Sequence, residues 1–234
     1  MKIRIGLEIG IENRILAWAL DYPGCFTYGE DEAEVLLRLP HALLKYEVWI
    51  KDHTDQSWVN LQDMDISVVQ VFHTWYIDKH FNPSNEGYEV NAWFRDDWRP
   101  LTTDEIERAL LIFHWQREEL LAGISTLSEE VLQQQYPDQR WNILGILKHI
   151  ANAESWYFDR MDYPSLARDE MPPDPIERLN ALQKLVESDF PHFADEFKVI
   201  GKQGEFWSCR KIVRRTLWHQ RDHIEHIKQL AMGD

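Results

Sequence analysis

The spacing of hydrophobic positions changes once along this chain, near Arg99-Pro100. Before that point apolar and polar residues mostly alternate, which is the pattern of half-buried strands. One stretch, residues 31–50, has helical spacing instead, and Pro40 inside it is expected to kink or break the helix. The order of strands, helix and strands predicts an α+β domain over residues 1–100. The predicted strands are 2–9, 14–20, a short one within 25–29, 66–77 and 88–94.

Beyond residue 100 every periodic segment is helical, and four helix starts carry capping residues. Four such helices with mostly short connections predict an all-α antiparallel four-helix bundle over residues 101–234. The starts are Thr102 with Glu105 as a capping box, Asn142 before a helix to about Met161, Asp174-Pro175 with Glu177, and Ser208 before a helix to about Ala231.

Charge and composition narrow the classes of partner. The net charge is −15, with −8 in residues 1–100 and −7 in residues 101–234, so a phosphate backbone would be repelled and no nucleic-acid binding is expected. No apolar run approaches the roughly 20 residues of a membrane span, and the first residues lack the features of a signal peptide, so we expect no membrane contact. Cys25 and Cys209 form no CxxC pair, and a cytoplasmic location is the simplest expectation.

Three histidines fall within eight residues near the end of the chain: His219, His223 and His226. At about 100° per residue they share one helix face, and an i, i+4 pair can bind one metal from successive turns. This face lies at the margin of the expected buried stripe, and His149 lies at the corresponding margin of the second helix. Margins of packed helices line interhelical cavities, so His149, His219 and His223 are candidate metal ligands. Half-buried histidines bonded to carboxylates are the alternative. The expected stripes are Ile143, Ile146, Ile150 and Tyr157 on the second helix, and Val213, Thr216, Leu217, Ile224 and Ile227 on the fourth.

Three neutral imidazoles suit zinc, nickel, copper or ferrous iron better than magnesium or calcium. A site with only three protein ligands leaves a position open for water or a substrate atom. Among the neighbours, His226 is expected to support the ligands rather than bind the metal. Glu154 is expected to form an ion pair between helices. Arg215 shares the histidine face and could meet an anionic substrate, although a solvated surface arginine is the simpler interpretation. His114 could point to the same cavity or simply pack, and Cys209 lies off the histidine face.

Two segments of the C-terminal half resemble the DinB-like superfamily. RWNILGILKHIANAE at residues 140–154 resembles its second-helix motif, and RKIVRRTLWHQRDHIEHI at residues 210–227 resembles its last-helix motif. The resemblance covers about residues 101–234. It implies a four-helix bundle with a three-histidine metal site, carried onto His149, His219 and His223, with zinc or nickel as the favoured divalent metal. Members of that family include thiol-dependent S-transferases and a mycothiol-dependent isomerase.

The N-terminal half resembles HicB-like antitoxin domains through ALDYPGCFTYGEDEAEVL at residues 19–36. That resemblance covers about residues 1–50 and implies a small sheet with a helix packed on it, in a family that binds protein partners. The position of Pro40 departs from a clean helix. The sheet could cover the bundle or form a homodimer contact.

Two functions from different classes remain open. The first is a metal-dependent transferase that uses a small thiol cosubstrate, in which the metal binds the thiol as thiolate. The second is a non-enzymatic binding or regulatory module with a structural metal and a HicB-like protein-interaction domain. No separate general base is evident in the sequence, which is compatible with a metal that itself acidifies the thiol.

Overall fold

The computed structural model describes residues 2–62 and 64–232. Its chain divides into two compact units. The sheet unit comprises Met1–Arg99 and Val199–Trp207, and the helical unit comprises Pro100–Lys198 and Ser208–Asp234. The sequence predicted one boundary at residue 100, which places residues 199–207 in the helical domain. In the structure these residues belong to the sheet unit instead. The fold therefore combines a mixed-sheet N-terminal region with a helical C-terminal region.

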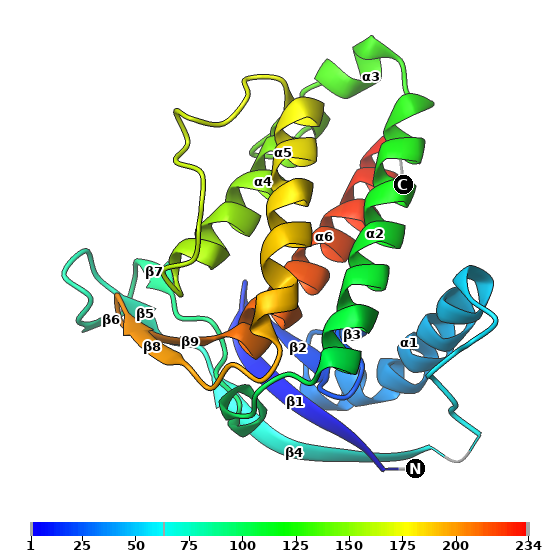
Figure 1. The fold of residues 1–234 in the computed structure, drawn as a ribbon, viewed down its shortest axis with the longest axis vertical. Helices are drawn as coiled ribbons and strands as arrows, with labels where there is room; N and C mark the ends of the chain where they lie inside the picture. The colour runs from blue at the N-terminus through cyan, green and yellow to red at the C-terminus, as the bar shows by residue number, and fades with distance from the viewer. Residues whose placement is uncertain (1, 63, 233–234) are drawn as a thin grey trace. The chain divides into compact units, whose positions relative to one another are not determined.

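A four-stranded sheet in the order β3-β2-β1-β4 forms the centre of the sheet unit (Figure 1). β1 (Lys2–Ile11) and β2 (Arg14–Ala19) form an antiparallel hairpin, and β3 (Phe26–Gly29) continues it. Glu12 and Asn13 have φ of 48° and 60°, which matches the right-handed twist of the flanking strands. β4 (Asp65–His73) pairs parallel to β1, so a helical crossover precedes it, as parallel pairing requires.

That crossover is α1 (Glu32–His53), which packs on β2 and β3. Asp31 caps it by accepting a hydrogen bond from the Glu34 N–H at 2.8 Å. The predicted break at Pro40 is wrong, because the helix continues through this residue. Leu39 and Leu43 on either side are fully buried, so tertiary packing offsets the local cost of the proline.

The remaining strands of the sheet unit are short. β5 (Tyr76–Ile77), β6 (Pro83–Ser84) and β7 (Tyr88–Glu89) form a small sheet, the 3₁₀ turn η1 spans Arg95–Trp98, and β8 (Val199–Lys202) pairs with β9 (Glu205–Ser208). The predicted strands 66–77 and 88–94 are therefore too long. Val90, Ala92 and Phe94 are buried at alternate positions, as in a strand, but side chains satisfy the backbone there. The Ala92 N–H donates to Glu8 at 2.9 Å and the Phe94 N–H to Asp97 at 2.8 Å.

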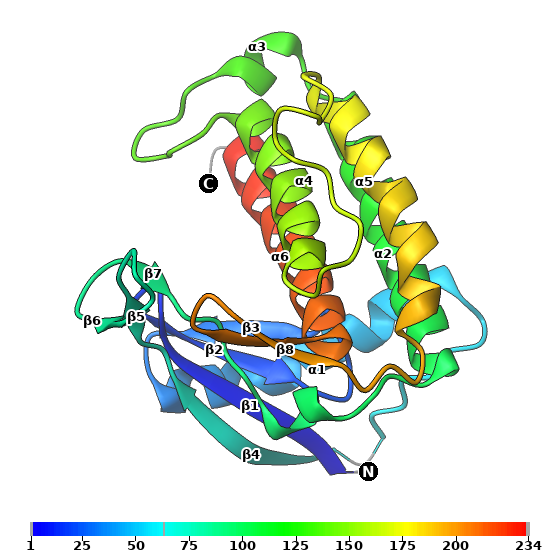
Figure 2. The same cartoon turned by 60° about the vertical axis from the view of Figure 1, so that its left-hand side comes forward.

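The helical unit contains four long helices and one short one (Figure 2). α4 packs against α5 and α6, and α2 packs against α6. Their shared core is apolar and includes Leu120, Ile146, Ile150, Leu182 and Ile224. The helices are α2 (Thr103–Ser125), the short α3 (Glu129–Gln133), α4 (Ile143–Asp159), α5 (Pro175–Asp189) and α6 (Cys209–Met232), and the 3₁₀ turn η2 (Phe190–Phe193) extends α5.

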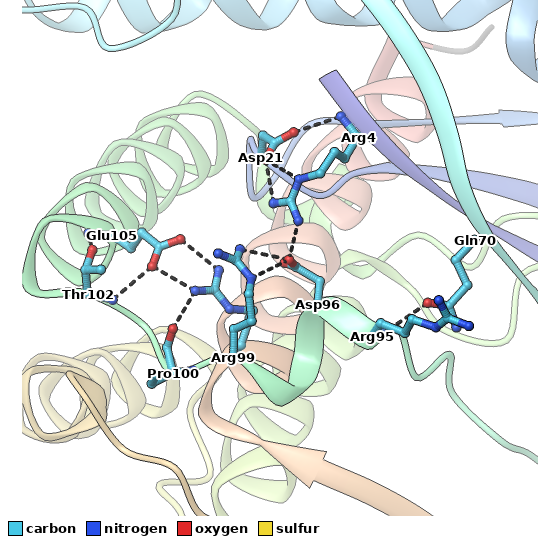
Figure 3. A network of polar contacts seen from close by, with 10 residues as sticks. Arg4, Asp21, Gln70, Arg95, Asp96, Arg99, Pro100, Thr102 and Glu105 are labelled. Carbon is cyan, nitrogen blue, oxygen red and sulfur yellow. Dashed lines mark hydrogen bonds and ion pairs between the residues drawn. The ribbon is translucent and has the colours of Figure 1, made fainter. Parts of the chain in front are cut away.

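The expected caps are present. Thr102 and Glu105 form the reciprocal capping box at 2.9 and 3.2 Å (Figure 3). Asn142 accepts from the Gly145 N–H at 2.9 Å. Asp174 and Ser208 cap α5 and α6 in the same way. Figure 3 also shows, within the sheet unit, Arg4 bonded to Asp21 and Asp96.

The helix directions differ from the antiparallel prediction. In Figures 1 and 2, α4 and α5 run the same way although they pack side by side. The connection between them, residues 160–174, is 15 residues long rather than short. A chain of that length can span the roughly 25 Å of a 17-residue helix, so α5 begins again beside the start of α4. None of the helices in residues 2–62 and 64–232 combines the length and the apolar character needed to cross a membrane.

Candidate metal centre

Three histidine side chains from two helices of the helical unit converge on one point. The Nε2 atom of His219 on α6 lies 3.1 Å from Nε2 of His149 on α4 and 3.1 Å from Nε2 of His223, one turn further along α6. One donor atom from each residue falls within 4.8 Å of the others. His219 is 6% exposed, and His149 and His223 are half-buried.

This arrangement is compatible with three ligands of one divalent ion. At a metal–nitrogen distance of 2.0–2.1 Å, two tetrahedral ligands lie about 3.3–3.4 Å apart, close to the observed nitrogen spacing. The donor set of three imidazoles is also the kind that first-row transition metals prefer. Without an ion, these contacts would be hydrogen bonds between imidazoles, with the donor and the acceptor of each set by the tautomers. Within the described residues, the buried Nδ1 atom of His219 has no hydrogen-bond partner.

Burial keeps all three imidazoles neutral. It is the main cause that lowers the pKa of His149, with Arg140 and Arg168 adding to the effect. The pKa of His219 falls well below its ordinary value because the ring is buried beside two other imidazoles and Arg215. Burial and two neighbouring histidines lower the pKa of His223 to about 3. Neutral imidazoles carry the lone pairs that a metal needs.

The start of α4 fixes the orientation of His149. The indole of Trp141 stacks on the His149 ring with centroids 4.5 Å apart and planes 24° apart. Trp141 can fold back over the helix because Gly145 has no side chain, since a Cβ there would come within 2.8 Å of Trp141 Cβ. Sequence reasoning missed this role of Trp141, although its position directly before the Asn142 cap gave the signal.

The other candidate residues lie outside the three-histidine cluster. His226 Nε2 is 2.9 Å from Gln139 Oε1, and its ring is 6.1 Å from that of His223. His114 instead pairs with Glu187 on α5 at 3.0 Å. Cys209 Sγ lies 3.6 Å from the Tyr163 hydroxyl, and burial raises the pKa of its thiol to about 11. The group of three converging donor residues does not include Cys209.

Arg215 is not the solvated surface arginine that the sequence favoured. Its side chain is buried, and its guanidinium carbon lies 4.2 Å from the centre of the Trp218 ring. The positive charge of Arg215 helps to lower the pKa of His219, which lies four residues further along α6. Arg215 therefore contributes a fixed positive charge to the surroundings of the cluster.

Glu154 forms the expected ion pair between helices, and its partner is Arg117 on α2 at 2.6 Å, with both side chains 1% exposed. Arg117 also donates to Gln220 Oε1 on α6 at 2.7 Å and to the Leu179 carbonyl on α5 at 3.0 Å. One guanidinium thus connects four helices of the unit. The sequence signal for Arg117 was a charged residue on the apolar face of α2, one turn after Phe113.

Comparisons with known proteins give one match. The family model of the DinB superfamily matches residues 112–227, a segment that contains His149, His219 and His223. This supports the DinB-like part of the sequence resemblance. The match does not reach residues 1–111, so the HicB-like resemblance of the N-terminal half stays a prediction. Searches of the curated proteins and of the solved structures found no match.

Proposed function

We propose that this protein binds one divalent transition metal, zinc or nickel, through His149, His219 and His223, and uses it in a transferase reaction with a small thiol. The observation that carries the proposal is the convergence of three Nε2 atoms at 3.1 Å spacings from two helices. The DinB superfamily match over the same segment supports it, because that family includes metal-binding proteins.

Three neutral protein ligands would leave a coordination position for the cosubstrate. When bound, the metal supplies the Lewis acidity that favours the thiolate at neutral pH. Trp141 holds the His149 ring, and the spacing of one helical turn holds His219 and His223, so the donor set is preorganised. In the transfer itself a bond forms between the thiol sulfur and an electrophilic carbon. The leaving group departs with the electrons of the bond that breaks, and the thiol proton goes to solvent.

Metal analysis of protein purified without added metal tests the first half of the proposal. We expect about one equivalent per chain. His223→Ala should lower metal affinity by more than the roughly 10–100-fold typical of residues that only support a ligand. Circular dichroism should show unchanged helix content, because the apolar stripes of α4 and α6 do not use that side chain. His226→Ala is the matched control and should cost much less metal affinity, because its Nε2 lies 2.9 Å from Gln139 Oε1 and outside the three-histidine cluster.

A thiol-transfer screen on the metal-loaded protein tests the second half. Turnover of an electrophile with one thiol class, lost in His223→Ala, would support a transferase. A full equivalent of metal with no turnover for any common thiol would favour the binding or regulatory module instead.

One feature of the sheet unit favours that second function. β4 is an edge strand, and Val68, Val69 and Val71 on it are 37%, 45% and 42% exposed. An apolar edge strand can pair with another chain, including a second copy in a homodimer. The binding or regulatory module would be supported if the protein lacks transferase activity but retains a partner or self-associates. The substitution Val69→Lys should then abolish that association.

A further inference from the structure

Three arginines act on the three-histidine cluster, although the chain as a whole carries −15. Arg140 and Arg168 act on His149, and Arg215 acts on His219. Within the described residues, no carboxylate is among the groups that shift the pKa values of these histidines. A net-acidic protein that gathers arginines at one place creates a local site for anions.

The geometry at the start of α4 ties Arg140 to the cluster. Its guanidinium carbon lies 4.5 Å from the centre of the Trp141 ring, and that ring in turn stacks on His149. A cation over an indole face is held without an anionic partner. Arg140 is exposed and forms no ion pair with a residue in the described part of the chain. Its charge is therefore available to a ligand.

The connection between α4 and α5 carries Arg168 alongside α4. Ser155 on α4 donates to the Leu166 carbonyl and accepts from the Leu166 N–H, both at 2.8 Å. Further along, Arg178 bonds to the Pro172 carbonyl at 2.8 Å and to Asn152 on α4 at 2.9 Å. Arg168 lies between these two attachments.

Arg168 is exposed, and like Arg140 it forms no ion pair with another described residue. The nearest acidic residues in sequence, Asp169 and Glu170, do not pair with it, and the Glu170 carboxylate accepts from the Ala167 N–H at 3.0 Å. Two uncompensated guanidinium groups therefore flank the cluster from two separate segments.

We propose that Arg140 and Arg168 form an anion-binding subsite beside the three-histidine cluster, so that the ligand of the cluster is a small molecule bearing a carboxylate. This rests on the proposed metal site. Three neutral imidazoles leave the full charge of a divalent ion uncompensated, and the arginines add to it, so the local charge favours an anionic ligand. A guanidinium group is well suited to bind a carboxylate, through parallel N–H···O bonds.

The test uses the full chain loaded with cobalt(II), whose thiolate-to-metal absorption band reports thiol binding directly. Mercaptoacetate, which carries a carboxylate, is titrated beside mercaptoacetamide, its neutral counterpart. For each thiol, the affinity of the variant is compared with that of the wild-type protein. The different intrinsic affinities of the two thiols for the metal then cancel. Arg108→Gln is the control, because Arg108 is an exposed arginine of α2 that is not among the groups acting on the three histidines.

In the double variant Arg140→Gln/Arg168→Gln, we expect mercaptoacetate affinity to fall about tenfold, the size of two exposed ion pairs. Mercaptoacetamide affinity should stay within about twofold, as should both affinities in the control. Equal losses for the two thiols, or no loss for either, would overturn the anion subsite and leave the metal site standing. Failure of the wild-type protein to bind cobalt would overturn both proposals.

Discussion

Replacing Arg117 by methionine would test whether a single buried guanidinium holds the helical unit together. The side chain is 1% exposed and donates to Glu154, Gln220 and the Leu179 carbonyl, from α4, α6 and α5 respectively. Methionine keeps most of the volume but removes every donor. The Glu154 carboxylate and Gln220 Oε1 would then lose this donor in the core, whereas the Leu179 carbonyl would keep the backbone hydrogen bond of its own helix.

The expected loss is large because the remaining charge stays buried. Removing one partner of a buried ion pair typically costs about 3–5 kcal/mol, a substantial part of a total stability of about 5–15 kcal/mol. Replacing both partners by apolar residues, in Arg117→Met/Glu154→Leu, should recover much of this loss, because no buried charge remains. The double variant therefore separates the cost of an unpaired carboxylate from a general failure of packing.

The stability lost in Arg117→Met should also depend on pH, in a direction set by the protonation of Glu154. Burial raises the pKa of this carboxyl above 4.5, and Arg117 opposes that rise. Without Arg117 the folded-state pKa rises further, so the folded protein binds more protons than the unfolded chain over a wider window above 4.5. Stability then falls as pH increases, by up to about 1.4 kcal/mol per pH unit, and the difference from wild type grows.

Urea denaturation followed by circular dichroism at pH 5, 6, 7 and 8, with chelator present throughout, measures both quantities. Arg108→Met, at an exposed position on the same helix, is the control and should change stability by no more than about 0.5 kcal/mol. A loss for Arg117→Met below about 1 kcal/mol that is constant with pH would refute the reasoning, since an unpaired buried carboxylate must respond to protonation.

Three further predictions concern other parts of the chain. Gly145→Ala should displace Trp141 from His149, because the added Cβ falls 2.8 Å from Trp141 Cβ. A metal titration should then show weaker binding, and an unchanged affinity would contradict the proposed role of the stacked rings. Pro40→Ala should raise the midpoint of thermal unfolding, since proline within a helix costs up to about 3 kcal/mol, and a lower midpoint would show that the ring packs favourably. The protein should not bind DNA or RNA with submicromolar affinity at about 150 mM salt, which a fluorescence anisotropy titration can check.

Several elements could be predicted from the sequence because their determinants are local. The N-cap at Thr102 bonds to a backbone N–H three residues ahead, so the start of α2 is specified within a single turn. The buried stripes of α4 and α6 follow from a spacing of three to four residues, and all of their predicted positions are buried. On α2 the buried apolar positions include Ile106, Ala109, Phe113 and Leu120, while Leu110 and Leu121 are half-buried.

Other features were set by contacts between residues far apart in the chain. Pro40 stays helical because α1 packs on the sheet, which a local propensity cannot anticipate. The segment after β7 has the alternation of a strand, but carboxylates of Glu8 and Asp97 take the place of a neighbouring strand. The common direction of α4 and α5 depends on the path of residues 160–174, which carries no periodic signal.

The candidate metal site could also be predicted only in part from the sequence. The sequence alone determined that His219 and His223 share one helix face, because a helix places residues four apart one above the other. It also marked His149 as a residue at the edge of an apolar stripe. Only the tertiary structure decided that His149 meets that pair across about seventy residues of chain, with nitrogens 3.1 Å apart. Packing of α4 on α6 determines that distance, and packing depends on the shapes of whole helix surfaces rather than on any single motif.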